Sequence, residues 1–317
     1  MQMIWGAVAL GLMAGAALAD PAATVLRDGF EGRDFAPEGG LYYRENAEQK
    51  AGTVAFGGPD TRNGAGALRL SVRQLCPVDA EGCSERAEIW EETALRVPYD
   101  VGVWYGFSVK FADPIPQDDH RYLIAQWKRE IGPEADGDFS PFLAFRMTVG
   151  RLFLTVETND VPPVATPGGD AVVACPAGQS PVWHRPETRQ MRVFLAGDRL
   201  WQGTEDGRFN ACTDATVVTP RGALPAPQDG WVDYAVYTLP GPDGSGRIEV
   251  FANGAWVVSV TGMIGHGDAG LGRNQYFKFG PYRDGAPDPW TMIYDDFIRS
   301  PDCTDLLPAA TCTAAGF

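Results

Sequence analysis

Lysine, histidine and helical patterns are all scarce in this chain of 317 residues. Only four lysines occur, Lys50, Lys110, Lys128 and Lys278, and only three histidines. Acidic residues outnumber basic ones by 41 to 26, which gives a net charge of -15. Because such a chain repels anionic polymers at long range, the composition argues against a nucleic-acid-binding protein. An acidic polysaccharide remains a candidate partner if the basic groups gather in one groove.

Patterns typical of a metal centre or cofactor site are also missing. The six cysteines form no CxxC pair and no cluster with histidine, which argues against a zinc site. Asp295 and Asp296 are adjacent and would face opposite sides of a strand, so we expect a solvated pair with one structural bond. We therefore predict no cofactor, with a structural calcium ion as the open alternative.

Only one apolar run is long, and it lies at the N-terminus. It extends from Ile4 to Ala19 and ends in a small-x-small pattern typical of a cleaved secretory signal peptide, although no Lys or Arg precedes it. A retained anchor is the alternative, and no later run is long enough to span a membrane. We expect residues 20–317 to form one secreted or periplasmic domain that acts as a monomer. Export favours disulfides, and the expected pairs are Cys76–Cys83, Cys303–Cys312 and Cys175–Cys212.

Short strand patterns fill most of the remaining chain and are separated by turns rich in the 38 glycines and 25 prolines. Residues 247–251 and 256–260 flank Asn253-Gly254, which predicts a hairpin. Another hairpin is expected about Gly150. Residues 159–190 lack periodicity and are expected to form a long loop, as is the tail. No helical run and no internal repeat is evident, so the pattern predicts an all-β sandwich or jelly roll.

One strand has unusual chemistry on its polar face. In residues 276–283, two phenylalanines face the expected core, and the opposite face carries Tyr276, Lys278 and Tyr282. A Gly-Pro pair before Tyr282 interrupts the strand, because Pro lacks a ladder donor and Gly tolerates a bend. The bend could bring Tyr282 towards Lys278, which a straight strand would leave about 13 Å away. The alternative is an edge strand with a solvated face.

Two more segments place polar side chains on one face of a strand, with apolar residues behind them. They carry Arg86 and Glu88, and Gln126 and Lys128; Arg146 lies in a further strand. Arg86 and Glu88 could instead be an ordinary ion pair within a sheet. Because Lys128 and Lys278, two of only four lysines, fall within these segments and the strand 276–283, we favour a functional interpretation.

These three segments resemble strands of the jelly-roll polysaccharide lyases, in particular the heparin lyase I and glucuronan lyase relatives and, more distantly, the alginate lyases. Arg86-Ala87-Glu88-Ile89 looks like their Arg-x-Glu-Leu/Ile strand, and Gln126-Trp127-Lys128 stands where alginate lyases carry Gln-Ile/Val-His. Residues 276–282 are similar to their Tyr-Phe-Lys-x-Gly-x-Tyr strand. The order along the chain agrees, and the looser similarity extends over residues 28–297.

The resemblance implies cleavage of a 4-O-linked uronic acid by β-elimination. The C5 proton becomes acidic once the charge of the adjacent carboxylate is neutralised, which Arg86 and Gln126 are suited to do. Tyr282 would transfer the proton as general base or acid. Since a free phenol has a pKa of about 10, it needs a cation nearby, and Lys278 is the candidate.

The chain departs from the alginate lyase pattern at Lys128, because lysine is a poor base unless its pKa is lowered. Either Tyr282 performs both proton transfers or the base lies elsewhere; His184 could reach the groove, although a structural role for it is favoured. The candidates for substrate binding are Lys128, Arg146, Glu88, Tyr276 and His184. With few basic residues in these motifs, an unsulfated polymer such as glucuronan is expected.

Two other functions compete with the lyase. A glycoside hydrolase needs two carboxyl groups about 5–9.5 Å apart, whereas Glu88 and Glu92 would be ~13 Å apart on a straight strand. A non-catalytic carbohydrate-binding module on the same sandwich would keep the groove without needing Tyr282. Only a lyase would release an unsaturated product that absorbs ultraviolet light.

Overall fold

The computed structural model describes residues 20–32, 40–43, 50–78, 80, 82–136, 139–159, 175–185, 190–196, 209–267 and 269–317. The strands, in chain order, are β1 (Leu26–Asp28), β2 (Tyr42–Tyr43), β3 (Gly52–Ala55), β4 (Leu68–Val72), β5 (Glu85–Arg86), β6 (Ile89–Glu91), β7 (Val97–Pro98), β8 (Val103–Phe111), β9 (Tyr122–Ile131), β10 (Leu143–Thr148), β11 (Arg151–Asn159), β12 (Ser180–Arg185), β13 (Gln190–Ala196), β14 (Ala211–Thr213), β15 (Thr216–Pro220), β16 (Val232–Leu239), β17 (Gly241–Ala252), β18 (Ala255–Ile264), β19 (Leu271–Arg283) and β20 (Trp290–Ser300). One α-helix, α1 (Ala309–Ala315), follows them.

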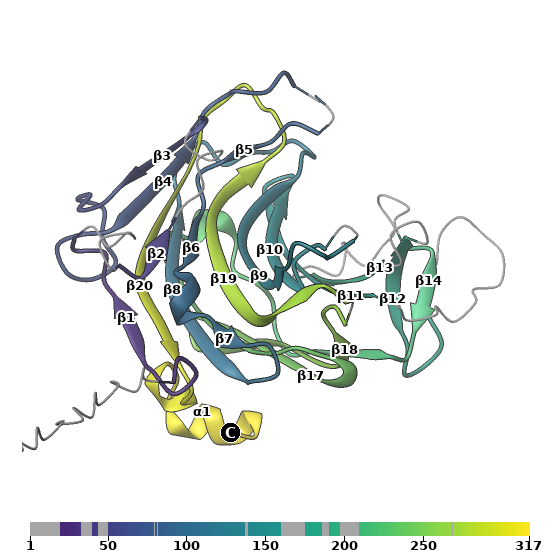
Figure 1. The fold of residues 1–317 in the computed structure, drawn as a ribbon. Coiled ribbons are helices and arrows are strands. Elements are labelled where there is room, and N and C mark those ends of the chain that lie inside the picture. The colour runs from purple at the N-terminus through teal and green to yellow at the C-terminus, as the bar shows by residue number, and fades with distance from the viewer. Residues whose placement is uncertain are drawn as a thin grey trace, which may run out of the picture.

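The strands form two antiparallel sheets. The first has the order β15-β18-β17-β16-β8-β20-β4-β3, with β1 paired to β20. The second has the order β14-β12-β13-β11-β10-β9-β19-β6-β2, with β5 and β7 also paired to β19. Figure 1 shows β19, β9 and β10 as neighbours that bend in the same direction. The predicted all-β jelly-roll sandwich is confirmed.

The two sheets are held together by an aromatic core. Phe277 and Phe279 of β19 are fully buried, as the alternation predicts. Phe277 packs 4.6 Å from Trp127 of β9 and 5.4 Å from Phe107 of β8, measured between ring centroids. Ring packing of this kind adds to the free energy of burying the apolar area. Since period 2 sends these rings inwards, the intervening residues of β9 and β19 face the other side of the second sheet.

Two β-bulges lie at the same level of the second sheet, one where β19 pairs with β9 and one where β10 pairs with β9. Between Phe279 and Tyr282, β19 advances three residues while β9 advances two, from Ala125 to Leu123. At the same level β10 advances only one residue, from Phe145 to Arg146. Such bulges turn side chains to new directions and are frequent beside active sites.

Gly280 makes the bulge in β19 sterically feasible. Its φ of +122° is a conformation that L side chains rarely adopt. A Cβ atom at this position would lie 2.4 Å from the carbonyl oxygen of Ala87 and 2.8 Å from Leu70 Cδ1. At the predicted Gly-Pro interruption, β19 therefore both bends and passes very close to the backbone at Ala87.

The connections between strands agree with the sequence-based expectations in part. All three predicted disulfides are present. Two expectations are wrong: β12 forms within the expected loop 159–190, and the tail contains α1. Within the described ranges no helix is long and apolar enough to cross a membrane. The expected signal peptide, residues 1–19, lies outside the described residues.

Candidate active site

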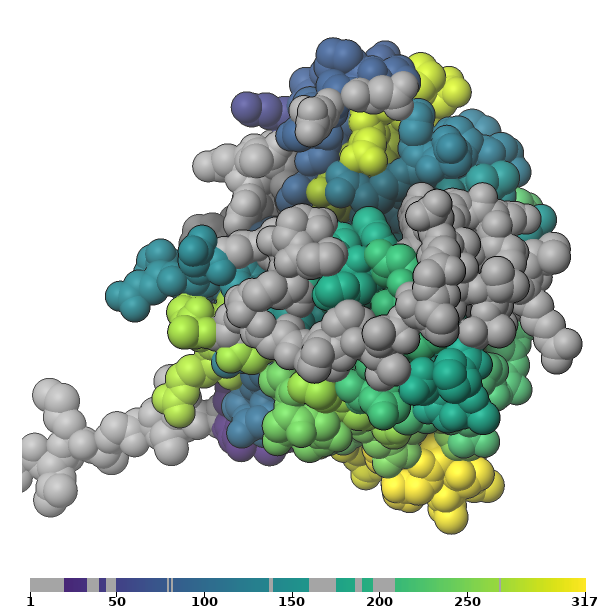
Figure 2. Space-filling model, turned by 90° about the vertical axis from the view of Figure 1, so that its right-hand side faces the viewer, coloured from purple at the N-terminus to yellow at the C-terminus, as the bar shows by residue number. Residues whose placement is uncertain are grey.

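A groove of ≈ 610 Å³ lies on the second sheet, and its lining is strongly basic. The described lining includes one acidic residue, Asp119. The basic lining residues are Arg86, Arg121, Lys128, Arg146, Arg185, Arg192 and Lys278. In Figure 2, chain segments coloured blue, teal and yellow, which are far apart in the sequence, lie side by side in the upper part of the face shown. Basic side chains from distant segments thus meet in one groove of an acidic protein.

Two rows of paired residues form the floor of this groove. In the first, Tyr282 of β19 pairs with Arg86 of β5 on one side and with Leu123 of β9 on the other. Leu123 in turn pairs with Arg146 of β10. In the second row, Lys278 pairs with Trp90 and with Gln126. The bulges therefore place Tyr282 and Arg146 at one level and Lys278 and Gln126 at the next.

Two guanidinium groups contact the aromatic ring of Tyr282. The Cζ atom of Arg86 is 4.0 Å from the ring centroid, and that of Arg121 is 4.8 Å from it. Arg86 also donates from Nε to Ser84 Oγ at 3.2 Å, and Arg121 forms an ion pair with Asp284. Cation–π contacts of this kind hold a ring in place while leaving its hydroxyl available.

Glu88 joins the residues of the second row. Its Oε2 lies 2.8 Å from Lys278 Nζ, and its Oε1 accepts a hydrogen bond from Gln126 Nε2. The ammonium group of Lys278 also lies 3.9 Å from the centroid of the Trp90 ring. Glu88 is 1% exposed and Lys278 and Gln126 are each 3% exposed, so this network is almost fully buried. Glu88 therefore fixes Lys278 and Gln126 in place.

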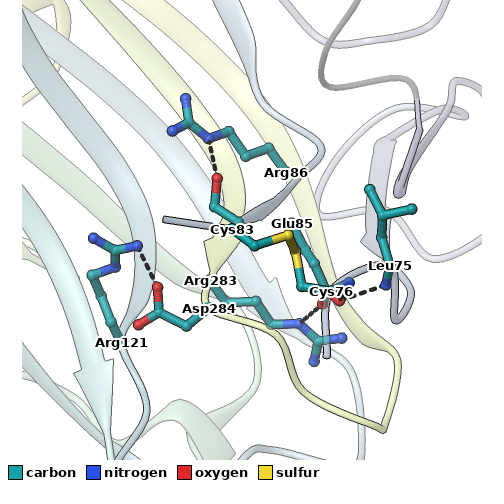
Figure 3. Close-up of a disulfide and its surroundings, with 9 residues drawn as sticks. Leu75, Cys76, Cys83, Glu85, Arg86, Arg121, Arg283 and Asp284 are labelled. Carbon is teal, nitrogen blue, oxygen red and sulfur yellow. Dashed lines mark hydrogen bonds and ion pairs between the residues drawn. A yellow bond between two sulfur atoms is a disulfide. The ribbon is translucent and has the colours of Figure 1, made fainter. Parts of the chain in front are cut away.

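The strand that carries Arg86 is fixed by the disulfide Cys76–Cys83 and its surroundings (Figure 3). Buried Glu85 accepts from the backbone N–H groups of Leu75 and Cys76 at 2.6 and 3.0 Å. It also accepts from Arg283 Nε at 2.7 Å. These bonds join the disulfide loop to β19 directly beside Arg86 and Tyr282.

Tyr276 and His184 lie outside the groove lining. Tyr276 is 4% exposed; its ring stacks on Trp90 at 5.5 Å and lies 4.4 Å from the Cζ atom of Arg96. His184 alternates along β12 with groove residues Trp183 and Arg185, so its side chain faces the other side of that strand. Glu88, another predicted substrate contact, is also absent from the groove lining, so contacts of these three residues with substrate stay predictions.

Several groove residues, Arg121 among them, were not anticipated from the sequence. Trp183, Arg185 and Arg192 lie on β12 and β13, and Arg185 and Arg192 pair with Glu157 at 3.3 and 2.7 Å. His120 also lines the groove, with its Nδ1 3.3 Å from Asp118 Oδ1. The alternation of residues 180–185 was an available signal for the strand.

The described residues contain no group of three or more His, Cys, Asp or Glu side chains that could hold a metal ion. Asp295, which we expected to be solvated, is fully buried. Its carboxylate accepts from the backbone N–H groups of Arg62 and Asn63 at 2.8 and 3.1 Å. The pKa of Asp295 is raised above its ordinary value, mainly because the carboxyl group is buried. This carboxylate orders the loop beside β20.

The groove therefore gathers basic side chains around a tyrosine on one sheet of a two-sheet sandwich. A family model described as polysaccharide lyase matches residues 39–298, and the chain belongs to this family. A comparison with curated proteins found no match.

Solved structures of similar fold include a glucuronan lyase from the fungus Trichoderma reesei. It shares 15% sequence identity and has a TM-score of 0.54, with 82% of this chain and 91% of that chain covered. The alginate lyase Aly36B is 12% identical with a TM-score of 0.38, with 88% of this chain and 97% of that chain covered. The glucuronan lyase shows that the fold is shared.

Proposed function

We propose that this lyase is exported and cleaves a uronic-acid-containing anionic polysaccharide by β-elimination. The observation that carries the proposal is the groove lining, in which seven basic residues and one acidic residue surround Tyr282 in a chain of net charge -15. Three disulfides fit an oxidising environment outside the cytosol. One chain supplies every named groove residue, so a monomer is sufficient.

In the proposed reaction, the phenolate form of Tyr282 takes up the C5 proton of the uronic acid and becomes a neutral phenol. The C5–H bond breaks, its electrons form the C4=C5 double bond, and the C4–O4 bond breaks. The departing O4 takes up a proton, which Tyr282 can return or water can supply. Cationic groups hold the carboxylate beside C5, so that negative charge developing there is stabilised. Arg86 and Gln126 are the contacts predicted from sequence, with Lys128 towards a neighbouring sugar.

A hydrolase is less well supported by the groove. Glycosidases require two carboxyl groups that flank the scissile bond. Among the described lining residues only Asp119 is acidic, and buried Glu88 is paired with Lys278. A carbohydrate-binding module would share the groove and would require no chemistry at Tyr282. Only a measurement of enzymatic activity distinguishes such a module from a lyase.

The test is a screen of uronic-acid polymers with the purified protein, read by absorbance of the unsaturated product. The panel should include glucuronan, alginate and heparin, because the groove has more basic residues than the sequence motifs alone predicted. Rising absorbance with matching new reducing ends is expected for one class of polymer. Reducing ends without absorbance would show a hydrolase, and binding with neither signal would show a carbohydrate-binding module.

A further inference from the structure

Among the described residues Arg146 forms no ion pair of its own, and the nearby carboxylate whose charge acts on it, Glu157, is already paired with Arg185 and Arg192. Lys278 pairs with Glu88, Arg121 with Asp284, and Arg185 and Arg192 with Glu157. For Arg146 the described structure gives one hydrogen bond, from Nε to Thr155 Oγ1 at 2.9 Å. Its side chain nevertheless lines the groove and is only 7% exposed.

This position is unfavourable for an isolated cation. Burying a charge without a partner costs free energy, because the charge loses water without gaining an opposite charge. Burial, and after it the charge of Arg192, lowers the pKa of Arg146 well below its ordinary value, and the charge of Glu157 offsets only part of this shift. A ligand that carries negative charge would relieve this cost. The guanidinium group of Arg146 is therefore a site at which a bound anion would supply the missing opposite charge.

The location of Arg146 suits the reacting sugar. It lies at the same level of the sheet as Tyr282, separated from it by the single pairing position Leu123. Negative charge on Tyr282 would act on Arg146 and favour its charged form. On the other side of Tyr282, Arg86 is already stacked on the phenol ring. A sugar above Leu123 would have Tyr282 on one side and Arg146 on the other.

We propose that Arg146 binds the carboxylate of the uronic acid whose C5 proton Tyr282 removes, while Arg86 and Arg121 orient the Tyr282 ring. This assignment rests on the proposed lyase function. The planar guanidinium can bind both carboxylate oxygens through two parallel hydrogen bonds. As the C5–H bond breaks, charge moves onto this carboxylate, and Arg146 stabilises it until the C4–O4 bond has broken.

The test compares Arg146→Met and Arg146→Lys with the wild type on the cleaved polymer and on its methyl ester, in which the carboxylates are neutral. Arg146→Met should lower kcat on the acid by about 100-fold, as for loss of a donor to developing negative charge, and should change the rate on the ester little. Arg146→Lys should be intermediate. Arg69→Met removes an exposed charge outside the groove and should match the wild type. The Tm of Arg146→Met should equal or exceed that of the wild type.

Two results would overturn the assignment. Equal losses on acid and ester would mean that Arg146 acts through the protein, and a raised KM with unchanged kcat would place it against another sugar. If the wild type yields no unsaturated product from any polymer, the lyase proposal itself fails. Calorimetry with a glucuronic acid tetrasaccharide then decides the carboxylate site: binding lost in Arg146→Met supports it, and binding equal to that of the wild type, or absent from both, overturns it.

Discussion

Tyr282 is held by its ring, so its hydroxyl can be removed without disturbing its contacts. Arg86 and Arg121 both contact the ring, at 4.0 and 4.8 Å from its centroid. Tyr282→Phe should therefore lower kcat by about 100-fold or more, as expected for a proton-transfer group. The free energy of unfolding should change by less than about 1 kcal/mol. Initial rates of ultraviolet absorbance and urea denaturation measure the two quantities, and an unchanged kcat would remove Tyr282 from the mechanism.

Glu88 acts on the site through Lys278 and Gln126. Glu88→Gln should lower the free energy of unfolding by about 3 kcal/mol, because it leaves the buried ammonium group of Lys278 without its counter-ion. The double variant Glu88→Gln, Lys278→Met should recover most of that loss, since neither charge then remains buried. Urea denaturation of the single and double variants measures both values. A single variant as stable as the wild type would mean that Lys278 reaches solvent or another partner.

At the scale of the elements, the bulge in β19 depends on one glycine. Gly280→Ala places a Cβ atom 2.4 Å from the carbonyl oxygen of Ala87 at a φ of +122°. The variant should lose about 2 kcal/mol or more of unfolding free energy and should also lose activity, because Tyr282 follows two residues later. Gly244→Ala is the matched control, with a φ of +100° but nothing within 4 Å of the new atom.

Comparison with Gly244→Ala separates the cost of the unusual backbone conformation from the cost of the steric clash with Ala87. Gly244→Ala should cost about 1 kcal/mol or less, as measured by thermal or urea unfolding, and should keep full activity. Equal losses for the two variants would mean that backbone conformation alone requires glycine at position 280.

The elements also show which parts of the site could be predicted from sequence. Alternation placed Arg86, Gln126, Lys278 and Tyr282 on one face, because period 2 is a local property of each strand. The aromatic core, the sandwich and the disulfides followed from similarly local signals. Neighbouring strands of a sheet, in contrast, need not be neighbours in the sequence.

The remaining groove residues depend on strand order and register. Arg185 and Arg192 line the groove because β12 and β13 extend the sheet beyond β11. The many Pro and Gly residues around β12 made its sequence look like a loop. The level of Arg146 relative to Tyr282 depends on bulges in two strand pairs. A shift of one residue in either pairing would turn these side chains to the other face. Sequence periodicity alone contains no such information.

At the scale of the whole molecule, charge is unevenly distributed. The chain has 41 acidic and 26 basic residues, yet the described groove lining has one acidic and seven basic residues. A concave surface with one sign of charge focuses the electric field and raises the local concentration of an oppositely charged ligand. Most of the protein repels a polyanion, while the groove attracts it. Capture of the polymer is therefore expected to be electrostatic and local.

This charge distribution predicts a strong effect of salt on substrate capture and a weak one on chemistry. Raising sodium chloride from about 50 to about 500 mM shortens the Debye length from roughly 14 to roughly 4 Å and screens the groove from the polymer. KM should therefore rise by about tenfold, a modest loss for a groove that concentrates its ligand by electrostatic focusing. The value of kcat should stay within about twofold, because the buried contacts at Tyr282 and Glu88 are screened much less.

Initial rates over a range of polymer concentrations at each salt concentration give KM and kcat separately. The methyl-esterified polymer is the control, since without charge its KM should be independent of salt. A salt-independent KM for the acidic polymer would mean that contacts other than the basic lining hold the substrate. A fall in kcat at constant KM would instead place the salt-sensitive interaction at the reacting sugar, where water has been excluded and screening should be weakest.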